Sequence, residues 1–386
     1  MKTAAVICEY NPFHFGHKYQ LEQTRAAGAT HIVGVMSGNF TQRGDVAVFD
    51  KYARAKTALE NGVDLVLELP TKYSLSSAES FARGAVGIIA ALGCVDMLSF
   101  GCECGDIAAL KEAAGAAEYA VHSEEFANRM KNGKSYPAAL AETVKEFYTD
   151  DVYEILCEPN NTLAVEYIKA LDDIGSSIAP FAVKRSGAAH DSADENGGFA
   201  SASLIRGKIL AGEDYSQFAP VIDAETADIK RLETAILAKL RMMKRDDFEN
   251  IYDAAQGLGE RLYKAVRMAG TLDELYFLTK TKRYTLARIR RAVLCSFLDI
   301  DKKQLLAPNA YIRILGMNSR GKEILAAAKC ELPVDTSLKS LMKRSREAFK
   351  QGAAEERYGN IYALAFPKPH RCGGEFTAKP VIIGIS

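Results

Sequence analysis

The first half of the chain alternates short apolar stretches with helical patterns, and this alternation constrains the fold more than any other feature. The apolar stretches are residues 4–8, 31–36, 64–69, 97–100 and 178–183. The helical patterns are residues 14–27, 50–61, 77–92, 107–122 and 163–172. Short runs of this kind are typical of strands buried on both faces of a parallel sheet. We therefore predict a doubly wound, Rossmann-like α/β sheet whose ligands bind beyond the carboxyl ends of its strands.

The second half differs from the first in pattern and in charge. From residue 224 onward Ala, Leu, Lys, Arg and Glu recur at helical spacing with short Gly breaks. Residues 221–386 contain 30 Lys and Arg against 20 Asp and Glu; since the whole chain has 49 of each, residues 1–220 contain 19 against 29. We predict an α/β domain over residues 1–215 and a basic, mainly helical domain over residues 216–386 that meets a polyanion.

Targeting signals and metal motifs are not expected. The longest apolar run, residues 85–100, is interrupted by Gly87, Gly93 and Asp96, and the N-terminal apolar stretch is too short for a signal peptide. The eight cysteines form no regular framework, and no second close pair completes a zinc site with Cys102 and Cys104. We expect a cytoplasmic protein with free thiols, no membrane association and no metal ligands.

Two histidines stand where the first strand pattern gives way to a helix. His14 and His17 are spaced to share one face of the first helical turn. Free backbone N–H groups and the helix dipole attract phosphate at such a position. The alternative is a pair of ordinary histidines at a helix start. The location directly after a first buried strand favours a nucleotide triphosphate site.

A polar loop, residues 36–44, directly follows the second strand pattern. Its side chains Ser37, Asn39, Gln42 and Arg43 are hydrogen-bonding groups, and its glycines permit close backbone approach. We predict that this loop contacts substrate, with an ordinary polar surface loop as the alternative. The helix that follows adds Lys51 and Arg54, which solvation alone could also explain.

Two further segments end at the same predicted edge of the sheet. Gly101 follows the fourth strand pattern and would let backbone lie against a base or ribose. Ser201, Ser203 and Arg206 open a helix after the fifth strand pattern, which gives a second cradle for phosphate. The alternative for the second segment is a capping serine with a solvated arginine.

Basic residues cluster in the helical half. Residues 280–291 include six cations and no acid, and we predict RNA contacts for Lys282, Arg283, Arg288 and Arg291, with Tyr284 available to stack on a base. A solvated helix face is the alternative, but the excess charge of this half favours RNA.

Five ordered motifs carry a family resemblance. They are Glu9-Tyr10-Asn11-Pro12-Phe13-His14-x-Gly16-His17, Met36-Ser37-Gly38-Asn39-Phe40-x-Gln42-Arg43-Gly44, Asp50-Lys51-x-x-Arg54-Ala55, Phe100-Gly101-x-Glu103-x-Gly105 and Pro159-Asn160-Asn161-x-Leu163. Together they resemble the bacterial tRNA(Met) cytidine acetate ligase family of the HxGH nucleotidyltransferase superfamily. Phe15 departs from the small polar residue that this family often has there.

The resemblance implies a two-step reaction. Acetate and ATP, accompanied by Mg²⁺, would give acetyl-adenylate and pyrophosphate, and the acetyl group would pass to the wobble cytidine of elongator tRNA(Met), giving N4-acetylcytidine. Acetate is already an anion, so the first step needs alignment and charge neutralisation, assigned to the catalytic residues His14, His17, Lys18 and Arg206. In the second step, positioning of the base should matter more than a strong base.

The resemblance also implies which residues bind each substrate. The ATP site would comprise Ile7, Cys8, Glu9, Tyr10, Asn11, Pro12, Phe13, His14, Phe15, Gly16, His17, Lys18, Tyr19, Gln20, Gly101, Asn161, Arg185, Ser201 and Ser203. Asn161 and Arg185 would lie near the adenosine, with adjacent Asn160 as the alternative to Asn161. The substrate and tRNA contacts would be Ser37, Asn39, Gln42, Arg43, Lys282, Arg283, Arg288 and Arg291. Neither a tightly bound prosthetic group nor an obligate protein partner is expected.

Two other functions remain open at this point. A simpler nucleotidyltransferase could join ATP or CTP to a phosphorylated metabolite with the same histidine turn, but it leaves the basic half unexplained. A noncatalytic RNA-binding protein could retain a nucleotide pocket. Its RNA binding would be indifferent to His17, and it would turn over no pyrophosphate.

Overall fold

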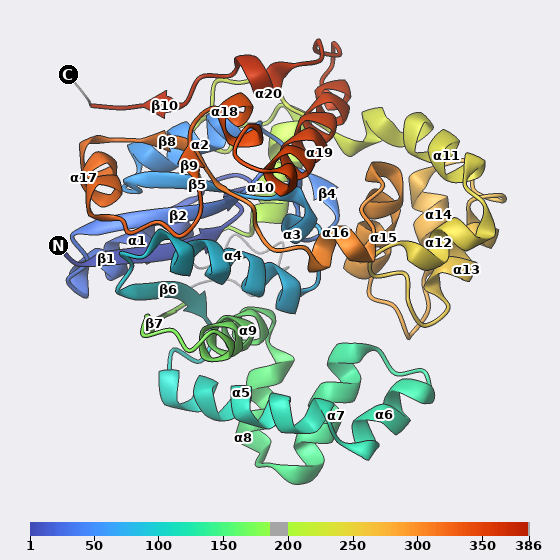
Figure 1. Ribbon diagram of the computed structural model, residues 1–386. Coiled ribbons are helices and arrows are strands. Elements are labelled where there is room, and N and C mark those ends of the chain that lie inside the picture. Colours follow the sequence, from blue (N-terminus) through green and yellow to red (C-terminus); the bar gives the residue numbers. More distant parts are fainter. Residues whose placement is uncertain (186–199, 385–386) are drawn as a thin grey trace.

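A computed structural model of the protein describes residues 1–185 and 200–384 (Figure 1). Its centre is a sheet in which five parallel strands run in the order β5-β2-β1-β6-β7. Their bounds are β1 (Thr3–Cys8), β2 (His31–Ser37), β5 (Leu65–Leu69), β6 (Met97–Cys102) and β7 (Ala179–Lys184). This order confirms the predicted doubly wound sheet. The direction of strand addition reverses between β1 and β6, and that reversal creates a crevice at the carboxyl ends of the strands.

Helices cover both faces of this sheet, which is why its strands are mostly apolar. Alternate residues of each strand face opposite layers: Ala4 and Val6 pack with α1 and α2, whereas Ala5 packs with α4 and α9. The predicted helices are confirmed as α1 (Phe15–Ala26), α2 (Lys51–Glu60), α4 (Ala78–Leu92), α5 (Ile107–Val121) and α9 (Pro159–Asp173). Short elements between them are β3 (Phe40–Thr41), β4 (Asp45–Val46) and α3 (Thr71–Ser74).

A helical insertion that the sequence analysis did not predict separates α5 from α9. It comprises α6 (Glu124–Lys131), α7 (Tyr136–Phe147) and α8 (Asp150–Cys157). These helices lie with α5 on the side of the molecule away from β10 (Val381–Ile382) (Figure 1). Phe126, Leu140, Val144 and Val152 bury the insertion against the core that α5 and α9 share with the sheet.

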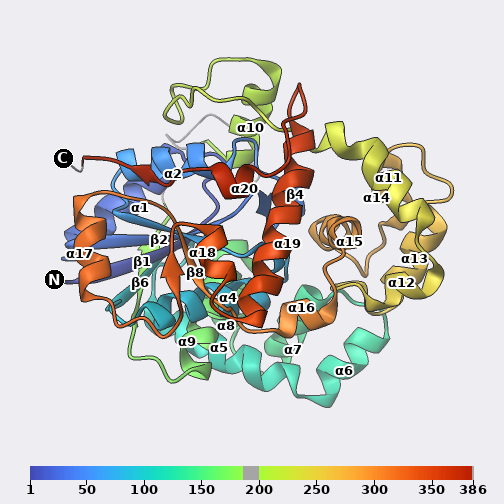
Figure 2. The same cartoon turned by 45° about the horizontal axis from the view of Figure 1, so that its top comes forward.

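The C-terminal half is mostly helical, as predicted. Its helices are α10 (Ala202–Ala211), α11 (Glu233–Met242), α12 (Arg245–Asn250), α13 (Leu258–Ala265), α14 (Leu272–Thr279), α15 (Leu286–Leu298), α16 (Lys302–Leu306), α17 (Ser319–Ala327), α18 (Leu338–Met342), α19 (Arg346–Tyr362) and α20 (Gly374–Thr377). Helices α11–α15 form a cluster beside the sheet with a core of their own (Figures 1 and 2). No helix of the described residues is long and apolar enough to cross a membrane.

Three strands from the second half also join the sheet. They are β8 (Ile312–Met317), β9 (Val334–Asp335) and β10, and β8 pairs antiparallel with β5. The central sheet is therefore built from both halves of the sequence. The boundary between residues 215 and 216 stays a prediction.

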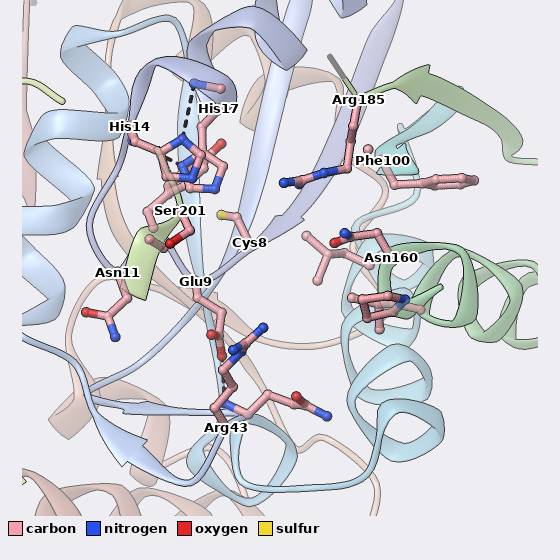
Figure 3. Close-up of a pocket in the computed structure, with 18 of the residues that line it drawn as sticks. Cys8, Glu9, Asn11, His14, His17, Arg43, Phe100, Asn160, Arg185 and Ser201 are labelled. Atoms are coloured by element: carbon pink, nitrogen blue, oxygen red, sulfur yellow. Dashed lines mark hydrogen bonds between the residues drawn. The ribbon is translucent and has the colours of Figure 1, made fainter. Parts of the chain in front are cut away.

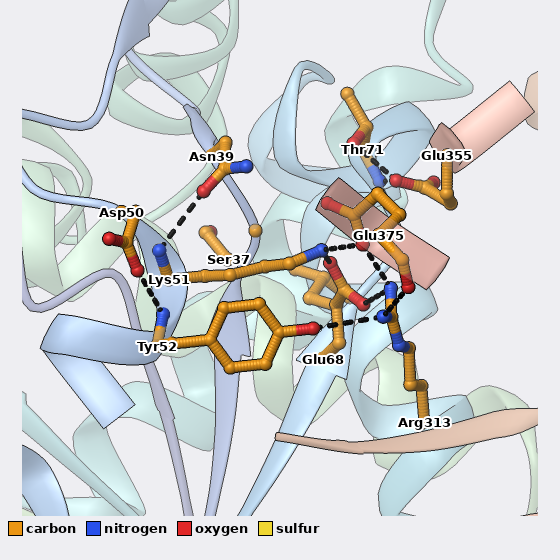
Figure 4. Close-up of polar contacts among 12 residues, drawn as sticks. Ser37, Asn39, Asp50, Lys51, Tyr52, Glu68, Thr71, Arg313, Glu355 and Glu375 are labelled. Atoms are coloured by element: carbon orange, nitrogen blue, oxygen red, sulfur yellow. Dashed lines mark hydrogen bonds and ion pairs between the residues drawn. The ribbon is translucent and has the colours of Figure 1, made fainter. Parts of the chain in front are cut away.

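A buried network of charges joins β8 to the N-terminal part of the sheet (Figure 4). Lys51 Nζ lies 2.6 Å from Glu68 and 2.7 Å from Glu375. Arg313 on β8 pairs with the same two carboxylates and donates to the Tyr52 hydroxyl at 2.9 Å. Because each charge is partnered, the network tolerates burial.

Candidate active site

A cavity of about 770 Å³ opens at the carboxyl ends of β1, β6 and β7, where the strand order reverses (Figure 3). Most of the residues predicted for the site converge on it from separate parts of the chain. Those that line it are Ile7, Cys8, Glu9, Tyr10, Asn11, His14, Gly16, His17, Tyr19, Gln20, Gln42, Arg43, Gly101, Arg185, Ser201, Ser203 and Arg206. The cavity is therefore the candidate active site.

The two predicted histidines form a reciprocal cap at the start of α1. His14 Nδ1 accepts the Gly16 N–H at 3.1 Å, and His17 Nδ1 accepts the His14 N–H at 3.2 Å. The rings stack with their centroids 3.7 Å apart. Because each Nδ1 is an acceptor, the hydrogen-bond pattern assigns the proton of each neutral ring to Nε2. The pair can therefore offer two N–H donors to a ligand in the cavity.

Both imidazoles are held in the neutral state. Burial, followed by the positive charges of Arg185 and Arg206, lowers the pKa of His14 to about 3. Burial, His14 and Arg185 lower the pKa of His17 well below its usual range. Neutral histidines can offer hydrogen bonds but no positive charge to a ligand, and the positive charge of the cavity comes from its lysine and arginine side chains.

Ser201, Ser203 and Arg206, which were predicted to cradle phosphate, lie together at the start of α10. Ser201 caps this helix by accepting the Leu204 N–H at 3.2 Å. Arg206, one turn further, donates to the Asn11 carbonyl at 2.8 Å and to the Ser203 hydroxyl at 3.1 Å. The start of α10 is therefore tied to the turn that precedes α1, and the two helix starts face one cavity.

A fully buried arginine fixes the ends of β1 and β2 beside the cavity. The Arg54 guanidinium donates to the main-chain carbonyls of Glu9, Ser37 and Gly38. Lys51 and Arg54 are 2% and 0% exposed, so the interpretation of both as solvated cations is wrong. Arg54 positions the strand ends, and Lys51 belongs to the buried charge network.

The polar loop after β2 packs directly on the helical cluster. Gly44 has φ +74°, and a Cβ there would lie 2.5 Å from Arg290 Cβ on α15. The Gln42 carbonyl accepts from Arg291 at 3.2 Å, while the Gln42 N–H donates to the Glu9 carboxylate at 2.6 Å. The loop therefore connects the end of β1 to α15. Only glycine permits this approach.

The structure separates the two candidate asparagines. Asn160 lines the cavity. Asn161 is 2% exposed, and its side-chain oxygen accepts the N–H groups of Glu103 and Cys104 at 2.9 and 3.1 Å. Asn161 thus supports the loop after β6, and the geometry makes Asn160 the candidate for direct contact with ATP.

Other predicted residues lie outside the cavity wall. In the ATP set these are Pro12, Phe13, Phe15 and Lys18, and in the substrate and tRNA set they are Ser37, Asn39, Lys282, Arg283, Arg288 and Arg291. Phe13 is fully buried, whereas Lys18 is exposed. The Asn39 side chain accepts the Lys51 N–H at 3.0 Å, so it shapes the loop. Their roles in binding stay predictions.

The basic residues of 280–291 divide between the surface and the interior. Lys282 is exposed, and Arg283 and Arg288 are partly exposed. Arg291 is 7% exposed and forms an ion pair with Asp253 at 2.8 Å. Tyr284 is 5% exposed and donates to the Gln256 carbonyl, so the expectation that its ring is available to stack on a base is wrong.

Sequence reasoning missed two parts of the cavity wall. One is an apolar surface of Phe81 on α4, Phe100 on β6, and Leu163 and Tyr167 on α9. Phe100 and Leu163 stand in two of the family motifs, but those motifs did not identify them as ligand contacts, and helical periodicity indicates only that Phe81 and Tyr167 point inward. The other is the start of α15, which supplies Leu286, Ala287 and Arg290.

Comparison with known proteins agrees with this geometry. The family model described as HIGH Nucleotidyl Transferase matches residues 1–374. The tRNA(Met) cytidine acetate ligase of Caldicellulosiruptor saccharolyticus is 37% identical, over 99% of each chain. That of Caldanaerobacter subterraneus subsp. tengcongensis is 39% identical, over 95% of this chain and 96% of the relative.

The chain belongs to the tRNA(Met) cytidine acetate ligase family.

Solved structures support the family membership. Thermotoga maritima TmcAL bound with alpha-thio ATP is 30% identical and superposes with a TM-score of 0.89, covering 99% of each chain. The apo form is 31% identical with a TM-score of 0.91, over the full length of both chains. The fold of this family thus extends through the helical half.

Proposed function

We propose that the protein activates acetate with ATP as acetyl-adenylate and transfers the acetyl group to the wobble cytidine of elongator tRNA(Met). The observation that carries the proposal is the convergence of two helix starts and several cations on one cavity. Relatives named tRNA(Met) cytidine acetate ligase match almost the whole chain. A family neighbour is bound with alpha-thio ATP.

For the first step the cavity offers donors and positive charge. The acetate oxygen attacks the α-phosphate, and negative charge builds up on that phosphate and on departing pyrophosphate. The Nε2–H groups of His14 and His17 and the guanidinium of Arg206 would stabilise this charge without a proton transfer. Lys18 is exposed on α1 and would help only from the rim of the site.

ATP would enter as its Mg²⁺ complex. Among the described residues, no group of three or more His, Cys, Asp or Glu side chains could hold a metal ion. These residues fit an Mg²⁺ ion that is held mainly by phosphate oxygens and water, with at most one protein carboxylate. The metal would supply positive charge at the β- and γ-phosphates.

For the second step the tRNA would approach along the helical cluster. Helix α15 reaches the cavity with Leu286, Ala287 and Arg290. We propose that cations near this end, among them exposed Lys282 and partly exposed Arg283, bind the RNA backbone. They would do so in a cytoplasmic protein, within a basic domain that begins near residue 216.

Labelled acetate tests the proposal with a panel of purified tRNAs and ATP. We expect acetate-dependent exchange of pyrophosphate into ATP and label in elongator tRNA(Met) alone. Exchange that depends on another acceptor, with no label in any tRNA, would favour a nucleotidyltransferase for small metabolites. RNA binding without exchange would favour a noncatalytic RNA-binding protein.

A further inference from the structure

Glu9 is the only carboxylate among the described residues that line the cavity. It stands at the end of β1 between the histidine pair and Arg43 (Figure 3). A carboxylate there repels the phosphates of ATP and cannot contribute to neutralising them. A carboxylate in a site that binds anions is therefore better suited to a role in the second step, the acetyl transfer.

Among the described residues, hydrogen bonds hold one carboxylate oxygen of Glu9 and none is made to the other. Oε1 accepts the Gln42 N–H at 2.6 Å and the Ser37 hydroxyl at 3.5 Å. The Glu9 main-chain carbonyl is anchored by buried Arg54. Within residues 1–185 and 200–384, no donor contacts Oε2. A fixed carboxylate with one open oxygen suits a ligand that donates a hydrogen bond.

We propose that Glu9 receives the target base: its carboxylate accepts a hydrogen bond from the exocyclic amine of cytidine and takes the amine proton as the acetyl group is transferred. This inference rests on the proposed function. The amine nitrogen forms a bond to the acetyl carbon, the bond from that carbon to the AMP oxygen breaks, and AMP leaves. The proton moves from nitrogen to Glu9 Oε2 and is later released to water.

The same contact would select the base. Cytosine presents an N–H donor at the position where uracil presents a carbonyl oxygen, and a carboxylate attracts the first and repels the second. The apolar wall of Phe81, Phe100 and Leu163 lies across the same cavity and offers a surface for a base. Glu9 thus accounts for both acceptance of cytidine and discrimination against uridine.

Charged and titratable groups around Glu9 leave it able to take a proton. Burial raises the pKa of Glu9, and the Gln42 N–H and nearby guanidinium groups lower it, with a net rise. The guanidinium groups belong to Arg206, Arg54 and Arg43. Burial also raises the pKa of the neighbouring Cys8 thiol and Tyr167 hydroxyl, so these stay neutral.

Glu9→Gln tests the inference, because it keeps the shape and removes the charge. We measure acetate-dependent pyrophosphate exchange for the first step and single-turnover transfer from supplied acetyl-adenylate to elongator tRNA(Met) for the second. General bases contribute roughly 100-fold or more, so we expect transfer to fall by about that factor and exchange to fall by less than about tenfold. Glu9→Asp should lie between wild type and Glu9→Gln in transfer.

The matched control is Glu103→Gln. This carboxylate accepts from Asn160 and from the Asn161 N–H, beside the cavity but outside its wall. We expect Glu103→Gln to change both steps by the same factor. Wild-type transfer should slow as the pH falls through the Glu9 pKa, and this dependence should vanish in Glu9→Gln.

Three results would overturn the inference while leaving the proposed function in place. The first is an equal loss in both steps for Glu9→Gln, and the second is unchanged transfer by this variant. The third is a loss of exchange by Glu9→Gln that added Mg²⁺ restores, which would make Glu9 a metal ligand. Failure of the proposed function would be recognised in the wild-type protein, which would then lack acetate-dependent pyrophosphate exchange.

Discussion

At the scale of single residues, the site depends on neutral imidazoles. His14 and His17 each use Nδ1 as a backbone acceptor, and burial keeps both rings unprotonated. Local sequence was sufficient to find them because the signal lies within one helical turn. Their charge state depends first on burial and then on Arg185, with Arg206 also acting on His14, and these contributions come from residues far away in sequence, so no local pattern could predict it.

The depressed histidine pKa values predict a stability that falls with acidification. An unfolded histidine titrates near pH 6.5, whereas folded His14 titrates at about 3. Between these values the unfolded chain binds more protons, so the free energy of unfolding decreases as the pH falls, by up to about 1.4 kcal/mol per pH unit for such a group. We expect His14→Asn, which keeps a capping oxygen, to show a shallower dependence in denaturant titrations at several pH values. The prediction is contradicted if the free energy of unfolding changes with pH by the same amount in the wild-type protein and in His14→Asn.

At the scale of elements, the sequence predicted those that are bounded by their own pattern and missed those that depend on a partner. The five parallel strands are predominantly apolar runs, and all were predicted although β5 contains Glu68. Strand β8 contains Arg313, which breaks its apolar run. Glu68 and Glu375, which neutralise this arginine, are remote in sequence. The insertion α6–α8 was missed, although Phe126, Leu140 and Val144 give it a buried face.

In the candidate site, too, the sequence predicted the parts that carry their own local pattern and missed contacts that depend on a remote partner. The strand ends and the helix starts carry recognisable residues, and these line the cavity. The assignment of Arg291 to RNA overlooked Asp253, which lies 38 residues away and pairs with it. The choice between Asn160 and Asn161 depends on which side of a helix start faces the cavity.

The contact between Gly44 and α15 gives a prediction about how the loop and the helical cluster are joined. Gly44→Ala should disturb this contact, because the new Cβ would meet the backbone and side chain of α15. Gly212 has a similar φ of +73° but open space around it, so Gly212→Ala measures the backbone strain alone. We expect Gly44→Ala to lower the free energy of unfolding by about 1–3 kcal/mol more than Gly212→Ala does. Equal effects in denaturant unfolding would show that the contact is unimportant.

At the scale of the whole molecule, the buried charge network joins segments from opposite ends of the chain. Glu375→Gln would leave Lys51 and Arg313 with Glu68 as their shared carboxylate partner. We expect a loss of about 3–5 kcal/mol in the free energy of unfolding, because a buried charge then lacks compensation. Exposed Glu331→Gln is the control and should change stability by less than about 0.5 kcal/mol. A small effect of Glu375→Gln would mean that solvent reaches the network.

The central claim is that one cavity activates acetate and delivers it to the wobble cytidine of elongator tRNA(Met). Nucleoside analysis by mass spectrometry, after incubation of unmodified tRNA(Met) with the protein, ATP and acetate, tests it most directly. We expect N4-acetylcytidine at the wobble position with wild-type protein. We expect none with His17→Ala, which should still bind tRNA. Unmodified cytidine with active wild-type protein, or acetylcytidine formed by His17→Ala at the wild-type rate, would contradict it.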